Sequence, residues 1–174
     1  MIWLIAAGLI LVSLGLVALV GAPYVPSQRR YVRQAFTELY KLTAADLVVD
    51  IGAGDGRVLR IAREFDARAI GFEIQPLLWL IGKYLNRGDA AIQLIWANFW
   101  THPLPDGVTL VYAFSVKRDN QRLTDKLRVE ANRLNREIHL MCLGSPLTDI
   151  EPQASLGAYW LYRFVPSQSN SVKL

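Results

Sequence analysis

The spacing of hydrophobic positions changes several times along the chain, and these changes predict alternating strands and helices. Short apolar runs typical of buried strands occupy residues 47–51, 69–73, 92–96, 108–114 and 137–143. Between the runs, apolar residues recur at helical spacing, which predicts helices over 56–65, 76–86 and 119–134. One or two aromatic-rich strands are expected within 155–165. The alternation predicts an α/β fold with an open, mostly parallel sheet and helices on both faces.

A longer apolar run stands at the N-terminal end. Residues 2–20 contain no charged residue, and Ser13 carries their only hydroxyl. At about 1.5 Å per residue, such a helix would extend roughly 28 Å, close to the hydrocarbon thickness of a bilayer. We therefore predict a single transmembrane anchor over residues 1–22, followed by one folded domain over 23–174.

Two alternative interpretations of this run are a cleaved signal peptide and a buried core helix. A signal peptide is expected to carry Lys or Arg before its apolar segment, and none is present. A core helix would need partners on every side from a small domain. Arg29, Arg30 and Arg33 follow the run, so the positive-inside rule predicts a single-pass membrane protein with its domain on the cytoplasmic or matrix side.

The segment after the run has the pattern of an amphipathic helix. Pro23 and Pro26 end the anchor, and Ser27 is the expected N-cap of a helix that reaches about Leu42. Its apolar face contains Val32, Phe36, Leu39 and Tyr40. We expect this face to pack on the domain, with contact to the membrane surface as the alternative.

Composition narrows the possible chemistry. The chain has 174 residues, enough for one domain with a core, and a net charge of +4 that suits anionic lipid better than nucleic acid. Cys142 is the only cysteine, so no internal disulfide forms, and we expect it in the core with Trp79, Trp96 and Trp160. Two histidines, far apart and without ligands at metal-binding spacing, predict no metal site.

A glycine-rich turn follows the first predicted strand. Gly52, Gly54 and Gly56 alternate with Ala53 and Asp55, directly after Asp50. Glycines without Cβ atoms let the main chain approach a ligand closely. We therefore assign a nucleotide-type cofactor to this turn and expect Asp50, Gly52, Ala53, Gly54 and Gly56 to bind it.

Residues at the ends of the next two strands add to this site. Glu73 ends the second strand, where a carboxylate accepts hydrogen bonds from ribose hydroxyls of either NAD or S-adenosylmethionine. Asn98 follows the third strand and offers a carbonyl to an adenine amino group, while Phe99 or Trp100 covers the ring. A turn asparagine beside core aromatics is the alternative for Asn98. The G-x-G-x-G spacing differs from the dinucleotide G-x-G-x-x-G.

Asp50 to Gly56 resembles the first motif of class I methyltransferases, which bind S-adenosylmethionine. The whole chain resembles a narrower group, the membrane-anchored protein-lysine methyltransferases that modify the ATP synthase c subunit and the adenine nucleotide translocase. The order of segments carries the likeness: an apolar N-terminal run, Pro23 to Ser27, Asp50 to Arg57, Gly71 to Pro76, and Asn98 to Trp100. Two positions depart from the group, because Asn98 replaces an acid and Ser115-Val116-Lys117 replaces Gly-Val-Pro.

The resemblance implies a Rossmann-like fold, S-adenosylmethionine as cofactor, and a protein lysine in or near the membrane as methyl acceptor. By the same resemblance, Trp100 and Ser115 contact the acceptor, and Tyr24 closes over the cofactor or orients the acceptor. The alternative for Tyr24 is an interfacial tyrosine beside the membrane. No catalytic residue is assigned, because transfer from a sulfonium depends mainly on positioning. Two alternatives remain: methylation of a membrane-soluble lipid or quinone, and a cofactor-binding module without catalysis.

Overall fold

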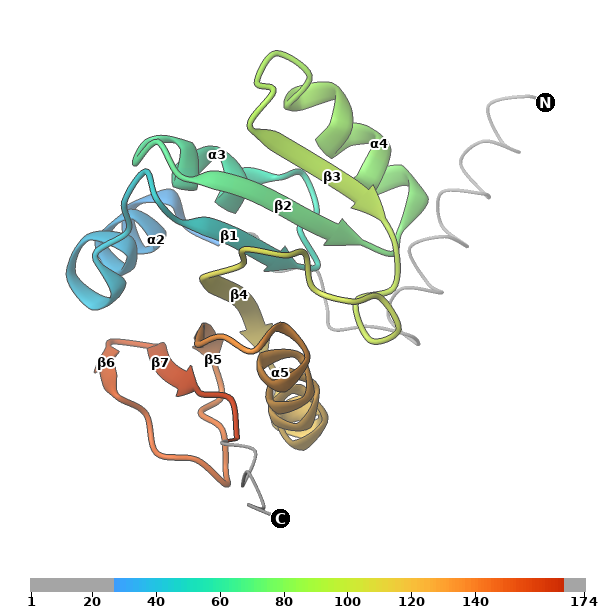
Figure 1. Cartoon of the computed structure of the whole chain (residues 1–174). Coiled ribbons are helices and arrows are strands. Elements are labelled where there is room, and N and C mark those ends of the chain that lie inside the picture. The colour runs from blue at the N-terminus through green and yellow to red at the C-terminus, as the bar shows by residue number, and fades with distance from the viewer. Residues whose placement is uncertain (1–26, 168–174) are drawn as a thin grey trace.

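The computed structural model describes residues 27–167, which form one mixed sheet flanked by helices (Figure 1). The strand order is β3-β2-β1-β4-β5-β7-β6. The strands are β1 Leu47–Ile51, β2 Arg68–Glu73, β3 Ile92–Trp96, β4 Leu110–Ser115, β5 Ile138–Gly144, β6 Ala154–Leu156 and β7 Tyr159–Phe164. Strands β1 to β5 pair in parallel, whereas β7 runs antiparallel to β5 and β6. The predicted mostly parallel sheet is confirmed.

The helices are those that the apolar spacing predicts, with shorter bounds. They are α2 Arg29–Gln34, the π-helical η1 Ala35–Tyr40, α3 Arg57–Arg63, α4 Pro76–Leu85, the 3₁₀ turn η2 Lys117–Asp119 and α5 Asn120–Leu134. The predicted N-cap was wrong. Gln28 precedes α2 without a side-chain cap, and the Ser27 hydroxyl instead lies 3.0 Å from the Tyr112 hydroxyl.

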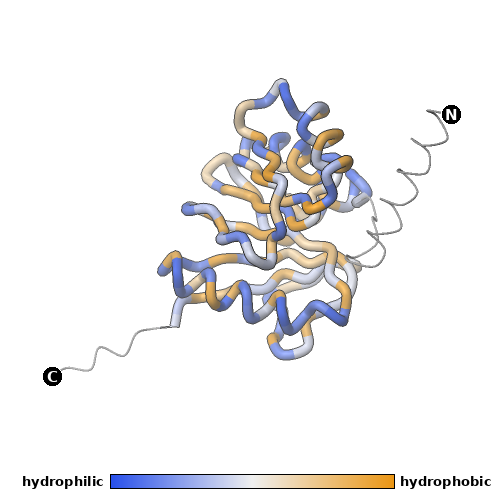
Figure 2. Tube along the Cα trace, turned by 90° about the vertical axis from the view of Figure 1, so that its right-hand side faces the viewer, coloured by the Kyte–Doolittle hydropathy of each residue, from blue (hydrophilic) through white to orange (hydrophobic). Residues whose placement is uncertain are grey.

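Two hydrophobic cores lie on opposite faces of the sheet, because neighbouring strand residues point in opposite directions. Val48 of β1 packs in the first core with α2, η1 and α3, whereas Val49 packs in the second core with α5. Residues of β4 alternate in the same way, with Tyr112 in the first core and Val111 in the second. Figure 2 shows hydrophobic strands through the middle of the body and hydrophilic stretches on its outer helices.

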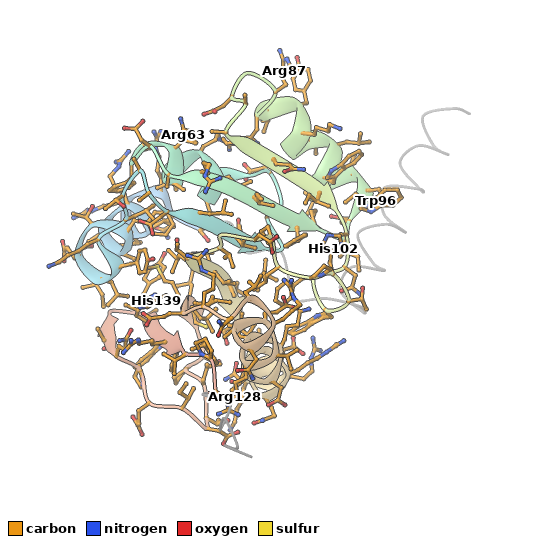
Figure 3. All side chains as sticks on the ribbon, viewed as in Figure 1. Arg63, Arg87, Trp96, His102, Arg128 and His139 are labelled. Atoms are coloured by element: carbon orange, nitrogen blue, oxygen red, sulfur yellow. The ribbon has the colours of Figure 1, made fainter. Side chains whose placement is uncertain are left out.

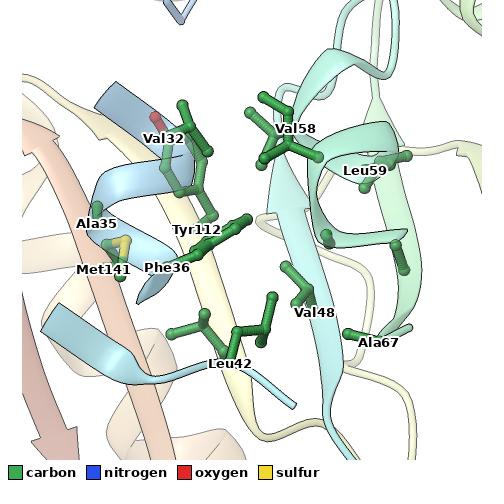
Figure 4. Close-up of a cluster of buried hydrophobic side chains, with 14 of the residues drawn as sticks. Val32, Ala35, Phe36, Leu42, Val48, Val58, Leu59, Ala67, Tyr112 and Met141 are labelled. Atoms are coloured by element: carbon green, nitrogen blue, oxygen red, sulfur yellow. The ribbon is translucent and has the colours of Figure 1, made fainter. Parts of the chain in front are cut away.

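Phe36 is central to the first core (Figure 4). Its ring is fully buried and meets the rings of Phe65 and Tyr112 edge-on, at centroid distances of 6.1 and 6.2 Å. Edge-on pairs add to the free energy gained from burial. The helix that precedes β1 therefore packs on the domain, as its apolar face predicts.

The predicted anchor over residues 1–22, and Tyr24, lie outside the described residues. Within 27–167, no helix combines the length and the apolar character needed to cross a bilayer. The division into an anchor and a domain at residue 22 stays a prediction.

We expect Phe36→Ala to lower the free energy of unfolding by about 3–5 kcal/mol, because it removes a buried ring and leaves a cavity. Val129→Ala on α5 is the matched control. Val129 is 61% exposed, so its truncation should change stability by less than about 0.5 kcal/mol. Denaturant unfolding followed by circular dichroism measures both. Equal effects of the two substitutions would contradict a central role for Phe36.

Candidate cofactor site

The glycine-rich turn is held against the end of β2. The main-chain N–H groups of Gly52 and Ala53 both donate to the Phe72 carbonyl, at 2.9 and 3.0 Å. Gly52, Gly54 and Gly56 all have positive φ angles, between 54° and 75°. Residues with a Cβ adopt these angles less readily, so glycine is strongly favoured at each position.

The turn is tightly packed on one side and open on the other. A Cβ added to Gly82 of α4 would lie 2.7 Å from the Gly54 carbonyl oxygen, and one added to Gly71 would lie 2.5 Å from the Ala53 Cβ. In contrast, a Cβ added to Gly52 would meet no atom of the described chain within 4 Å. The main chain at Gly52 therefore faces open space that a ligand can enter closely.

Glu73 links the turn to the start of α4. One carboxylate oxygen accepts the N–H of Gly54 and the other accepts the N–H of Gln75, both at 2.8 Å. The side chain is only 5% exposed. A carboxylate has about four acceptor positions, so these two bonds orient the group and leave capacity for a ribose diol.

Asp50 is a second buried carboxyl group at this edge, only 4% exposed. Burial, together with the nearby carboxylates of Glu73 and Asp55, raises the pKa of Asp50 to about 8. Negative charge is therefore costly here in the free protein. A cationic ligand would relieve that cost, and S-adenosylmethionine carries both a sulfonium and an ammonium group.

Gln75 is a candidate site residue that the sequence analysis did not assign. Its side-chain nitrogen is buried and has no hydrogen-bond partner among the described residues. Buried donors without partners are uncommon, and one beside a ligand site suggests a bond that the ligand completes. Its position between Glu73 and Pro76 was the available signal.

The loop after β3 uses Asn98 to build a turn. The Asn98 side-chain oxygen accepts the N–H of Trp100 at 3.0 Å, and its main-chain oxygen accepts the N–H of Thr101. Phe99 is buried in the second core, with its ring 6.3 Å from that of Phe72. In this structure Asn98 thus makes the contacts of a turn asparagine beside core aromatics, which was the alternative prediction for this residue. Adenine contacts by Asn98 and Phe99 stay predictions.

The end of β4 is closed by a short hydrogen-bond chain. The Ser115 hydroxyl donates to the side-chain oxygen of Asn120, and the Asn120 amide donates to the Pro146 carbonyl, both at 2.5 Å. Ser115 and Asn120 are buried. Ser115 extends beyond Ala113, the partner of Ile51 in β1, so it stands at the same edge as the glycine turn. Its predicted contact with an acceptor would require this chain to open.

The structure thus brings Asp50, the glycine turn and Glu73 together at the carboxyl ends of β1 and β2. Asn98 follows β3 at the same edge, since Trp96 pairs with Glu73. Trp100 is half-buried further along that loop, under the Arg122 guanidinium at 4.4 Å. Cys142 is in the core as expected, and burial raises the pKa of its thiol to about 12. Trp96 was expected in the core but is 59% exposed.

Known proteins similar to this chain are methyltransferases. A protein-lysine N-methyltransferase of Saccharolobus islandicus (strain REY15A) is 33% identical over 115 residues, which cover 62% of this chain and 69% of that protein. This chain belongs to the same methyltransferase family. A Xenopus laevis lysine N-methyltransferase, named for the c subunit of ATP synthase, is 39% identical over 59 residues, which are 34% of this chain and 24% of that protein. No family model matches the chain.

Solved structures agree on the fold. An RNA methyltransferase from Salinibacter ruber, in complex with S-adenosyl-L-homocysteine, superposes with a TM-score of 0.70 at 22% identity. The match covers 83% of this chain and 95% of that one. The 23S rRNA methyltransferase ErmE superposes with a TM-score of 0.57 at 18% identity, over 69% of this chain and 48% of that one. The Rossmann-like methyltransferase fold is thereby confirmed.

The methyltransferase uses S-adenosylmethionine, which supplies a methyl group on a positively charged sulfur. The described residues fit this cofactor. Gly52 would leave room for it, Glu73 would present acceptors to a ribose, the Asp50 carboxyl would favour its positive charge, and the Gln75 nitrogen, unpaired within residues 27–167, would donate to it. Each group is already oriented by main-chain hydrogen bonds or burial, so little reorganisation accompanies binding.

We expect Glu73→Ala to weaken S-adenosylmethionine binding by about 1.5–3 kcal/mol, because it removes hydrogen bonds to a charged group. Titration calorimetry measures this loss. Glu130→Ala is the matched control, since Glu130 is also a buried carboxylate but pairs with Lys126 and Arg133 on α5. The control should lose stability and keep its affinity. Equal affinity losses in both variants would show that Glu73 acts only through folding.

Asp50→Asn is expected to change stability and binding in opposite directions. The pKa of Asp50 is about 8 when folded and near 4 when unfolded, so the native state binds more protons between these values. Wild-type stability is therefore lost as the pH rises from about 4 through about 8. Without cofactor, the difference in thermal stability between the variant and the wild type should favour the variant more at pH 9 than at pH 5. Its affinity for the cationic cofactor should fall. A loss of both at pH 9 would contradict this account.

Proposed function

We propose that this methyltransferase transfers the methyl group of S-adenosylmethionine to a lysine side chain of a protein at a membrane surface. The observation that carries the proposal is the 33% identity to a protein-lysine N-methyltransferase over 115 residues. The second relative is named for lysine methylation of a component of ATP synthase. The apolar run over residues 2–20 supports attachment of the domain to the same membrane by a single-pass anchor over 1–22.

The chemistry asks little of the protein beyond positioning. The lysine nitrogen attacks the methyl carbon in line with the breaking carbon–sulfur bond, whose electron pair stays on sulfur. The nitrogen must first lose a proton, and burial beside the cofactor lowers the pKa of a lysine toward that state. Tyr24, Trp100 and Ser115 are the residues that we propose around this acceptor.

The proposed acceptor region lies where β4 ends. The bond from Ser115 to Asn120 holds the β4 end against the segment at Pro146. An entering lysine would meet this bond or displace it. We therefore propose that this region helps to select the acceptor. It is also where Ser115-Val116-Lys117 replaces the Gly-Val-Pro of the group that the chain resembles.

Methylation of a lipid or quinone is the competing activity. Membranes from a strain that lacks the enzyme, incubated with the protein and methyl-labelled S-adenosylmethionine, distinguish the two. We expect label in a protein that yields methyl-lysine on hydrolysis, and none with Glu73→Ala. Label extracted wholly into organic solvent would support the competing activity. Label in nucleic acid, or in no fraction despite cofactor binding, would also overturn the lysine proposal.

A further inference from the structure

Exposed apolar side chains gather around helix α4. The described residues include ten exposed large hydrophobic side chains, and seven of them belong to this region. Six lie on α4 or just before it: Ile74, Leu77, Leu80, Ile81, Tyr84 and Leu85. The seventh is Trp96 at the end of β3 (Figure 3). Its ring stacks on that of Trp79, with the ring centroids 6.0 Å apart. We call these seven residues the α4 surface. Contiguous apolar patches of this kind mark interaction sites.

The packing of α4 explains why its side chains are exposed. Gly82 is its only buried residue, and it brings the helix against the Gly54 carbonyl and the Leu94 side chain. The helix thus meets the body through a glycine and turns larger residues outward. An exposed apolar face on a helix favours a partner that covers it.

The charges around the α4 surface favour an anionic partner. Residues 74–88 contain Lys83 and Arg87 and no acidic residue, and the carboxylate of Asp89, which follows them, pairs with Arg63. Both basic groups lie over aromatic rings at the border of the surface, Lys83 at 5.0 Å over Trp79 and Arg87 at 3.9 Å over Tyr84. Apolar residues with Trp and Tyr, bordered by basic side chains, are typical of helices that lie in the interface of a bilayer.

The position of Ser27, where the described chain begins, would allow α4 to reach a bilayer that holds residues 2–20. Ser27 bonds to Tyr112 of β4 in the first core. Helix α4 lies on the same sheet face, because its Gly82 meets Leu94 of β3, which packs against that core. From β4 to β3 there are three strand spacings, about 15 Å. Six residues separate Ser27 from the apolar run, and extended they reach at most about 20 Å. A membrane that holds residues 2–20 is therefore close enough for α4 to touch.

We propose that the α4 surface is a lipid-binding surface that lies in the headgroup region of an anionic bilayer. This inference deepens the proposed function and rests on its membrane attachment. Because Trp96 pairs with Glu73, contact by the α4 surface holds the cofactor edge beside the membrane. Acceptor lysines at the membrane surface would then be favoured over lysines deep in solution.

Tryptophan quenching in vesicles tests the proposal. The full chain, with Trp3→Phe and Trp96→Phe, is reconstituted in phosphatidylcholine–phosphatidylglycerol vesicles that contain brominated lipid. Leu80→Trp adds a reporter on the α4 surface at a position that is 54% exposed. Val129→Trp on α5 is the matched control at a position that is 61% exposed. Binding of S-adenosylmethionine by both variants, measured by titration calorimetry, confirms that each is folded.

We expect bromolipid to quench roughly half of the emission added at residue 80, as for side chains in the interface, and almost none of that added at 129. Equal quenching at both positions would overturn the proposal. So would an emission at residue 80 that is blue-shifted yet unquenched, since a second copy of the chain or residues 2–20 would then cover the surface.

Alkaline extraction of the same vesicles tests the lipid-binding surface and the transmembrane anchor independently. Protein retained after extraction, with residue 80 unquenched, would reject the lipid-binding surface and leave the anchor standing. Protein released by extraction, yet quenched at residue 80 beforehand, would reject the anchor and support the surface. Both outcomes are independent of the acceptor that receives the methyl group.

Discussion

The two hydrogen bonds that the Glu73 carboxylate accepts from Gly54 and Gln75 hold the cofactor site together. They join the glycine turn after β1 to the start of α4 after β2. One side chain thus fixes the β1–α3 connection against the β2–α4 connection. The positive φ angles of the turn become accessible because glycines occupy it, and the carboxylate then selects one arrangement. The same group remains available to a ribose.

The carboxyl groups of Asp50 and Glu73 are both buried at this edge of the sheet, so a negative charge on both costs free energy. Glu73 is held by N–H donors, whereas burial and neighbouring negative charge raise the pKa of Asp50. The free protein is thus less stable at high pH than it would be without Asp50. A positively charged cofactor bound at this edge would offset this penalty. The edge would then exchange some folding free energy for affinity, as binding sites often do.

Helix α4 connects the site to the outer surface. Its Gly82 allows close contact with Gly54, and that close contact leaves Leu80 and its apolar neighbours facing outward. Tight packing beneath the cofactor turn and an apolar outer face are therefore consequences of the same helix position. If a bilayer covers the apolar outer face, this helix position would serve both the cofactor turn and membrane contact.

The alternation of apolar runs and helical spacing was enough to predict the strands, the helices and the parallel sheet, because burial imposes those periods directly. The glycine turn after β1 was likewise readable because its φ angles favour glycine, and so was the position of Glu73 at the end of β2. Their contacts with the cofactor stay predictions. Local patterns could not reveal that Ser27 bonds to Tyr112, that Trp96 is exposed, or that Gln75 holds a buried free donor. These facts depend on which distant segments pack together, and only the tertiary structure decides that.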